Sequence, residues 1–231
     1  AFAQEKLAHT FLFTGIRGVG KTTIARIIAM GLNCETEKKP TANPCGICSN
    51  CKAILQDRYE DVLEIDAASN TGVDDVREII SSLKYRPSKG SYKVFIIDEV
   101  HMLSNSAFNA LLKTIEEPPS FVKFIFCTTE MQKIPITIVS RCQKYNLNRV
   151  TLTALCNYLE EIVDLEKLDI SEQAISVIAR NSEGSIRDSL TILDQCILSF
   201  NNETITVESV NQTMGLTSQS FLLDLYINIV N

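Results

Sequence analysis

The sequence predicts an α/β fold in which a parallel sheet is flanked by helices and followed by a smaller all-helical region. Short apolar runs of strand type alternate with segments of helical periodicity over the first two-thirds of the 231 residues. One run, residues 94–97, is apolar without alternation, as expected for a strand buried on both faces. After about Asn148 the strand signal disappears and only helical periodicity remains. This order is typical of βαβ units followed by a helical domain.

Five strands account for the apolar runs of the first region. The expected strands are 11–13, 62–65, 94–97, 122–127 and a short one at 143–147. Helices are expected from about residue 21 to 32, across 73–83 and across 108–115, where apolar residues recur at helical spacing. Pro118 and Pro119 end the last of these helices. Residues 135–140 add one further apolar turn of helix.

The second region contains four expected helices. Apolar residues at helical spacing predict three of them, over 155–163, 175–179 and 186–198. Ser171 and Thr206 are residue types that cap helix N-termini, and Thr206 begins the short fourth helix. We therefore expect three domains, at 1–148, at 149–214 and, as the start of a helical oligomerisation domain, at 215–231. Because the chain has no initiator methionine, we expect it to be a piece of a longer protein.

Composition and charge argue against several classes of protein. The net charge of −6 is unlike that of a free-standing DNA-binding domain, which is more often basic, so contact with nucleic acid should be local or shared with partner subunits. No apolar run approaches the roughly 20 residues needed to cross a bilayer. The first residues lack the basic and apolar regions of a signal peptide. We expect no membrane contact and a reducing, cytoplasmic location.

Four of the eight cysteines lie in one segment with the spacing C-x10-C-x2-C-x2-C. They are Cys34, Cys45, Cys48 and Cys51. In a reducing compartment, clustered thiolates are expected to be metal ligands rather than disulfides. Four ligands predict a structural zinc site, in a loop that protrudes from the sheet. An iron–sulfur cluster and free thiols are the alternatives, although the fourth cysteine of a ferredoxin run is missing after Cys51.

A glycine-rich motif lies between the first strand and the first helix. Residues 15–22 match G-x-x-x-x-G-K-[ST] in full. Glycines let the backbone N–H groups point at phosphate oxygens, Lys21 supplies charge to the β- and γ-phosphates, and Thr22 offers a hydroxyl to Mg²⁺. The nucleotide-binding residues expected here are Gly15, Arg17, Gly18, Val19, Gly20, Lys21, Thr22 and Thr23. The motif therefore predicts a site for ATP and Mg²⁺.

Two adjacent carboxylates, Asp98 and Glu99, end the third strand. Ligands of open α/β sheets bind at the carboxyl ends of strands. Asp98 suits the Mg²⁺ shell, and Glu99 suits the activation of water as a general base, with Asp98 as the second candidate for that role. A solvated strand end without chemistry is the alternative. The two histidines, His9 and His101, are interpreted as structural.

Longer motifs add a family resemblance. Segments 98–103, 109–119 and 140–142 resemble the clamp-loader AAA+ ATPases, and segments 15–22, 32–35 and 64–69 narrow the resemblance to the gamma/tau subunits of bacterial DNA polymerase III. The likeness covers nearly the whole chain. It implies an AAA+ P-loop NTPase fold, with a zinc-binding insertion at 34–51 and a helical lid domain.

The resemblance also implies roles for single residues. Thr129, with Thr128 as the second candidate, would sense the γ-phosphate. Arg141 would be an arginine finger that reaches the ATP of a neighbouring subunit, and Arg187 a second sensor carried by the lid, because arginine stabilises the charge of transferring phosphate. A surface charge is the more ordinary role of a lone arginine. The family has a segment ahead of the first strand that helps to hold adenine and ribose, and this chain begins too close to residue 11 to contain all of it.

Three functions follow from these features. The resemblance implies an ATP-hydrolysing motor in a hetero-oligomeric ring with other clamp-loader subunits, a sliding clamp, primed DNA and single-stranded-DNA-binding protein as partners. A non-catalytic scaffold subunit would be expected to lack the P-loop lysine or the Asp-Glu pair, whereas this chain has both. A zinc-dependent nucleic-acid-binding module is disfavoured by the acidic balance and by the few basic residues of the cysteine segment, Lys38, Lys39 and Lys52.

Overall fold

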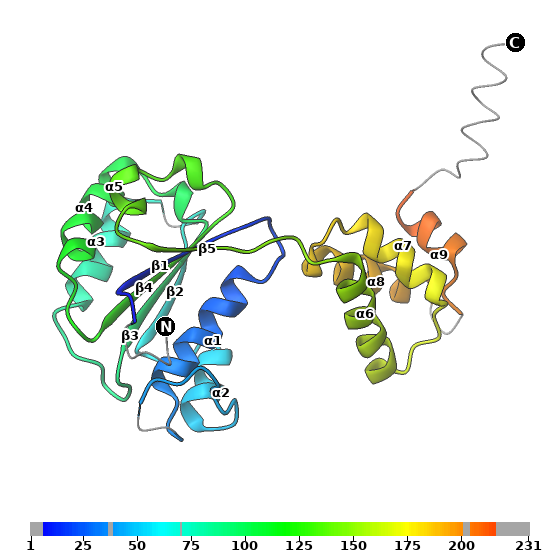
Figure 1. The fold of residues 1–231 in the computed structure, drawn as a ribbon, viewed down its shortest axis with the longest axis horizontal. Coiled ribbons are helices and arrows are strands. Elements are labelled where there is room, and N and C mark those ends of the chain that lie inside the picture. Colours follow the sequence, from blue (N-terminus) through cyan, green and yellow to red (C-terminus); the bar gives the residue numbers. More distant parts are fainter. Residues whose placement is uncertain (1–6, 37–38, 70, 201–203, 216–231) are drawn as a thin grey trace, which may run out of the picture. The chain divides into compact units, whose positions relative to one another are not determined.

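The computed structural model describes residues 7–36, 39–69, 71–200 and 204–215 (Figure 1). Contacts divide the chain into two compact units. The first comprises Ala1–Gly15 and Gly20–Leu147, and the second comprises Ile16–Val19 and Asn148–Asn231. The third helical domain expected at 215–231 lies outside the described residues, apart from Gly215.

The first unit is built on a five-stranded sheet. Its strands are β1 (Thr10–Thr14), β2 (Val62–Asp66), β3 (Lys93–Asp98), β4 (Val122–Thr128) and β5 (Gln143–Asn146). All the pairings are parallel, in the order β2-β3-β4-β1-β5. The five expected strands are confirmed, and because they are parallel, their carboxyl ends meet at one edge.

The burial of the strands agrees with their positions in the sheet. Every residue of the central strand β4 is buried, and so is the apolar interior of β3, as the run without alternation predicts. Successive side chains point to opposite faces. Phe11 and Phe13 of β1 pack in one core cluster, whereas Leu12 between them packs in the other. The sheet therefore has a buried core on both faces.

Helices cover the two faces unequally. One face carries α1 (Lys21–Asn33) and α2 (Ser49–Leu55), and the other carries α3 (Val73–Ser82), α4 (Asn105–Glu116) and the short α5 (Ile136–Val139) (Figure 1). Two 3₁₀ turns, η2 (Val100–Met102) and η3 (Met131–Lys133), follow β3 and β4 directly. These turns bend the chain at the edge where the strands end.

Helix α2 corrects one expectation from the sequence. The cysteine segment was expected to be a loop that protrudes from the sheet, but its last part is helical. Cys51 is 0% exposed and Ile54 is 2% exposed, in the same core cluster as Ala25 and Ala29 of α1. The segment therefore packs into the core of the first unit, because apolar residues of α2 cover α1.

The second unit contains four helices in the part that the structure describes. They are α6 (Leu152–Glu166), α7 (Glu172–Asn181), α8 (Ile186–Ser199) and α9 (Val207–Thr213). Their apolar faces meet in one cluster that includes Leu159, Ile178 and Leu193. The expected caps are confirmed: the side chains of Ser171 and Thr206 accept the backbone N–H groups of Ala174 and Ser209.

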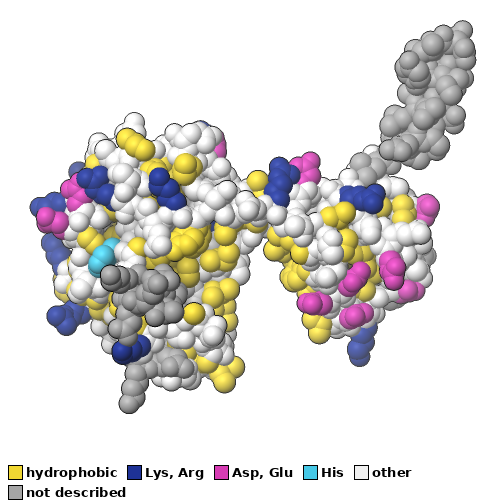
Figure 2. Space-filling view, viewed as in Figure 1, with side chains coloured by type: hydrophobic (Ala, Val, Ile, Leu, Met, Phe, Trp, Pro, Cys, Tyr) yellow, Lys and Arg dark blue, Asp and Glu magenta, His cyan; other side chains and the backbone are white. Residues whose placement is uncertain are grey.

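Acidic side chains mark the surface of the second unit (Figure 2). Those exposed on α6 are Glu160, Glu161, Asp164 and Glu166. Such a surface repels the phosphate backbone of nucleic acid. Among the described residues, no helix combines the length and the apolar character that a membrane span requires.

Candidate functional site

The glycine-rich loop leads from β1 into the first turn of α1. Gly18 and Gly20 have φ angles of +75° and +95°, a backbone region that glycine enters without a steric penalty. Gly20 is the N-cap of α1, and Lys21 is its first residue. The Lys21 side chain is 5% exposed, and its Nζ donates to the carbonyl of Gly15 at 3.0 Å. A lysine and a helix N-terminus at one place form an anion-binding site.

Thr22 and Asp98 lie next to each other at the carboxyl edge of the sheet. The Thr22 hydroxyl donates to Asp98 Oδ2 at 2.7 Å. Thr22 belongs to the first turn of α1, whereas Asp98 ends β3, a strand separated from β1 by β4. A hydroxyl and a carboxylate oxygen are ligands suited to a hard cation such as Mg²⁺.

Glu99 lies just beyond the end of β3 in an unusual backbone conformation. Its φ and ψ angles are 45° and 43°, which is left-handed and costly for a residue with a Cβ atom. Its N–H donates to Asp98 Oδ1 at 2.9 Å, and its Oε2 accepts the hydroxyl of Thr129 at 3.1 Å. Thr128, the second candidate for the sensor, is 0% exposed and lies against His101. In the described chain, Thr129 is therefore the threonine that hydrogen-bonds to Glu99, whereas Thr128 contacts the histidine.

Two side-chain contacts near the site were not predicted from the sequence. Arg26 of α1 forms a two-point ion pair with Glu64 of β2, at 2.6 and 2.7 Å. That hydrogen bonding raises the pKa of Arg26. His101, interpreted from the sequence as structural, lies buried beside Glu99. The sequence did offer one indication of this contact. His101 is only two residues after Glu99, and a tight turn between them can bring the imidazole against the carboxylate.

The other predicted residues come from several elements. Thr23 and Arg17 are exposed. Arg141 follows α5, on the face of the sheet opposite α1; its guanidinium pairs with Glu116 at 2.6 Å and donates to the carbonyl of Thr137. Arg187 is the second residue of α8 and so belongs to the second unit.

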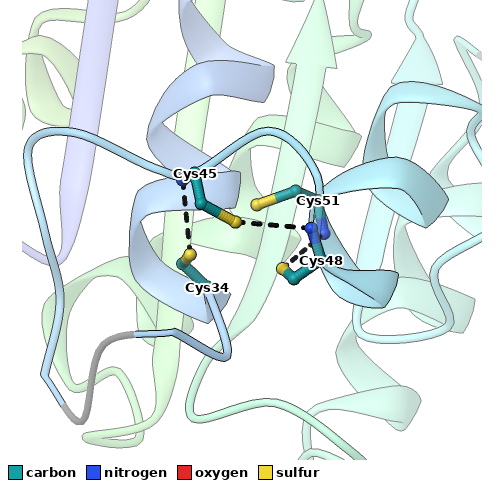
Figure 3. Close-up of side chains that lie close together, drawn as sticks. All are labelled: Cys34, Cys45, Cys48 and Cys51. Atoms are coloured by element: carbon teal, nitrogen blue, oxygen red, sulfur yellow. Dashed lines mark hydrogen bonds between the residues drawn. The ribbon is translucent and has the colours of Figure 1, made fainter.

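The four clustered cysteines converge (Figure 3). Their sulfur atoms all lie within 4.8 Å of one another. The N–H of Cys45 donates to Cys34 Sγ, that of Cys48 to Cys45 Sγ, and that of Cys51 to Cys48 Sγ, at 3.3 to 3.5 Å. A tetrahedral site with bonds of about 2.3 Å would separate the sulfurs by roughly 3.8 Å. The donor set and its spacing therefore fit a four-coordinate metal ion.

Hydrogen bonds and burial shift the pKa values of these thiols in different directions. Hydrogen bonds from the Cys45 N–H and from Thr36 lower the pKa of Cys34 to about 6. The N–H of Cys48 lowers the pKa of Cys45. Burial raises the pKa of Cys51 to about 12. A metal ion would bind Cys34 as a thiolate and would have to displace a proton from Cys51.

Sequence comparisons agree with the resemblance. A family described as "DNA polymerase III, delta subunit" matches residues 1–151, and one described as "DNA polymerase III clamp loader subunit, ATPase lid domain" matches residues 154–202. The chain is 48% identical to DNA polymerase III subunit tau of Bacillus subtilis over 222 residues, which are 96% of this chain and 39% of that protein. It is 46% identical to the tau subunit of Escherichia coli over 220 residues, 95% of this chain and 34% of that protein. The chain thus spans well under half the length of these relatives.

Solved structures support the fold alone. The RuvB Holliday junction branch migration motor of Thermotoga maritima matches with a TM-score of 0.63 and 21% identity, over 93% of this chain and 63% of that one. Its likeness supports the arrangement of a parallel sheet with flanking helices followed by a helical domain. Because a family description covers more than half of the chain and the tau subunits are more than two-fifths identical over nearly all of it, the chain belongs to the DNA polymerase III clamp-loader subunits of the gamma/tau type.

Proposed function

We propose that this chain hydrolyses ATP as a motor subunit of the DNA polymerase III clamp loader. The observation that carries the proposal is the continuous set of contacts at the carboxyl edge of the sheet. Thr22 donates to Asp98, the N–H of Glu99 donates to Asp98, and Thr129 donates to Glu99. Three motifs distant in the sequence thus supply adjacent side chains, as phosphoryl transfer to water requires.

Each residue of this edge has a distinct task in the proposal. The N–H groups of the glycine-rich loop and Lys21 hold the β- and γ-phosphates. Thr22 and Asp98 hold Mg²⁺, which neutralises charge on the phosphates when bound. Glu99 accepts a proton from the attacking water, and Thr129 contacts the γ-phosphate. Gly15, Arg17, Gly18, Val19, Gly20 and Thr23 complete the nucleotide-binding set.

Two arginines extend the site beyond these motifs. Arg141 lies on the face opposite α1, which supports its action on the ATP of a neighbouring subunit rather than on its own. To do so it must leave or share its ion pair with Glu116. Arg187, in the first turn of α8, contributes positive charge from the lid domain that we assign to residues 149–214. A third domain at 215–231 completes the proposed organisation.

The cysteine cluster holds a structural zinc ion in this proposal. Four cysteine sulfurs within 4.8 Å of one another are the donor set of a closed tetrahedral site, with no position left for substrate. The absence of a further cysteine soon after Cys51 favours zinc over an iron–sulfur cluster. Elemental analysis distinguishes the two metals.

The proposed partners are those of a clamp loader. They are the other subunits of a hetero-oligomeric ring, a sliding clamp, primed DNA and single-stranded-DNA-binding protein, in the cytoplasm. ATP binding closes the ring and opens the clamp, and hydrolysis releases the clamp onto DNA. The acidic surface of the second unit favours contact with DNA that is shared among subunits.

Mixed assemblies test the proposal. ATP turnover is measured for the full-length protein alone and then with partner subunits, clamp and primed DNA, which should stimulate it. Rings are then assembled from Arg141→Ala and Lys21→Ala subunits. Interfaces that join an intact P-loop to an intact Arg141 should hydrolyse ATP, and the others should not. A wild-type protein that binds ATP without hydrolysing it in any assembly would instead be a scaffold subunit.

A further inference from the structure

His101 is a buried imidazole with oxygen atoms at both ring nitrogens. It lies in η2, and its side chain is 6% exposed. Nδ1 lies 3.0 Å from the hydroxyl of Thr128 and 3.4 Å from Glu99 Oε2. Nε2 lies 3.4 Å from Glu130 Oε1. A buried polar ring is stable only with such partners, and here one of them is the proposed general base.

Glu99 requires a contact of this kind. Its backbone is left-handed, so the neighbouring structure must hold it in place. Among the described residues, the hydroxyl of the exposed Thr129 and the ring of His101 contact its carboxylate Oε2. A ring that is enclosed by its neighbours constrains a carboxylate more than an exposed hydroxyl does, because it cannot rotate freely.

The far side of the ring is also fixed. Glu130 Oε1 accepts Lys133 Nζ at 2.8 Å, and the N–H of Glu130 donates to the Thr128 hydroxyl at 3.0 Å. The hydrogen bond from Lys133 lowers the pKa of Glu130, which favours its anionic form. Thr128 itself is the last, fully buried residue of β4. His101 is therefore held between the end of β4 and the turn that follows it.

We propose that His101 is a positioning residue that holds the Glu99 carboxylate in its productive orientation. The proposal rests on the proposed ATPase function, with Glu99 as the base. In this role His101 acts through the Glu99 carboxylate rather than on the nucleotide itself. The Nδ1 side of the ring carries the effect, because it faces Glu99. A shift of about 1 Å in a catalytic group can slow a reaction roughly 100-fold.

Three substitutions separate this role from simple packing. His101→Ala removes both contacts, His101→Asn retains a polar atom near the position of Nδ1, and His101→Gln retains one near Nε2. The measurements are the single-turnover hydrolysis rate and the ATP dissociation constant, on the full-length protein assembled with its partner subunits. We expect a roughly 10- to 100-fold slower rate in His101→Ala with unchanged ATP affinity. Asn should restore most of the rate and Gln less, whereas His9→Asn, the control at the other histidine, should leave it unchanged.

A double substitution tests whether His101 acts through Glu99. The variant Glu99→Gln/His101→Ala should be no slower than Glu99→Gln alone, because the group that His101 positions is already gone. Additive losses would show an independent role and overturn the proposal. So would a wild-type rate in His101→Ala, or an Asn variant that folds, binds ATP and is as slow as Ala.

The failure of this inference is distinguishable from that of the proposed function. If the wild-type assembly hydrolyses no ATP, the proposed function fails. If the wild type hydrolyses ATP and His101→Ala does so equally well, only the role of His101 fails. Should His101→Ala not fold, the folded Asn and Gln variants decide, because equal rates in these two would remove the distinction between Nδ1 and Nε2.

Discussion

The two ends of α1 carry two sites that are built in opposite ways. At its N-terminus, Lys21 and Thr22 meet Asp98, which comes from a strand far along the chain. Directly after its C-terminus, Cys34 meets three cysteines of the same short segment. The first site offers N–H groups and a cation to an anion. The second offers sulfur atoms to a cation.

The difference shows what each site depends on. The phosphate-binding edge requires the register of the sheet, because parallel pairing aligns Ile97 of β3 with Phe126 of β4 and so lets Glu99, just beyond β3, meet Thr129, just beyond β4. The cysteine cluster requires only local turns to bring its sulfur atoms together. It is nevertheless not independent, since Cys34 and Cys51 lie in the same core cluster as Ala25 and Ala29 of α1. Helix α1 therefore connects the phosphate-binding site, which depends on the whole sheet, to the cysteine cluster, which depends on one short segment.

The largest effect is expected at the N-terminal end of α1. Lys21→Ala should reduce ATP hydrolysis to background, because the variant loses the charge that neutralises the β- and γ-phosphates. Its thermal unfolding midpoint should stay close to that of the wild type. The measurement is steady-state ATP turnover alongside a thermal melt. Lys52→Ala, a substitution of an exposed lysine on α2, is the matched control and should keep full turnover. Undiminished turnover in Lys21→Ala would show that the glycine-rich loop is not the ATP site.

The next effect separates binding from chemistry at the same edge. Glu99→Gln keeps the shape of the side chain but removes the base, so the single-turnover rate should fall roughly 10²- to 10⁴-fold while ATP still binds. Rapid-mixing kinetics and a binding titration measure the two quantities. Glu117→Gln, at an exposed position after α4, controls for the loss of one carboxylate. A near-normal rate in Glu99→Gln would move the base to Asp98.

A smaller effect on ATP is expected from the other end of α1. Cys51→Ser should abolish binding of the one zinc ion expected per chain and lower the thermal midpoint, because a structural zinc site contributes directly to folding free energy. Since α2 packs on α1, ATP affinity should also weaken, by several-fold rather than completely. Elemental analysis, a thermal melt and an ATP titration are compared with those of Cys156→Ser, a cysteine outside the cluster. If ATP affinity did not change after zinc loss, the two ends of α1 would be independent.

The smallest effect concerns a buried carboxylate beside the cysteine segment. Asp61 accepts the N–H groups of Ser88, Lys89 and Gly90 at 2.8, 2.9 and 3.0 Å. Burial opposes its ionisation, but these donors outweigh burial and lower its pKa. A lowered pKa in the folded state means that the stabilisation is present above the unfolded value of about 3.9 and is lost as the pH falls through the folded value.

Asp61→Asn should therefore lower the free energy of unfolding at pH 7 by about 1 to 3 kcal/mol, and the gap to the wild type should narrow in acid. Unfolding at neutral and acidic pH measures it, with the exposed Asp57→Asn as control. Zinc content and the ATP hydrolysis rate should not change. A gap that widened in acid would contradict the assigned role of the carboxylate.

The comparison also explains what the sequence could predict. Strands were predicted to within one or two residues, because apolar runs and parallel packing leave few alternatives. The convergence of Cys34, Cys45, Cys48 and Cys51 was predicted from spacing alone. Helix α2 was missed, because the cysteines interrupt its apolar periodicity. The burial of Cys51 was missed with it.

Contacts that depend on the direction of a single side chain were beyond prediction. The location of Asp98 and Glu99 at the ligand-binding edge was expected, because both residues follow a strand. The contact of His101 with Glu99 depends on the tight turn η2, and the pair of Arg141 with Glu116 depends on how α5 packs beside α4. Neither follows from periodicity or from motif spacing. The catalytic roles of these residues stay predictions.

The left-handed backbone of Glu99 has a consequence for how this protein can change. A glycine at position 99 would adopt φ near 45° without the penalty of about 1 to 3 kcal/mol that a Cβ atom brings. If only folding stability were selected, glycine would therefore be favoured at this position. The chain would then be more stable but would lack its proposed base. The glutamate of this chain therefore gives up some thermal stability in exchange for the proposed base.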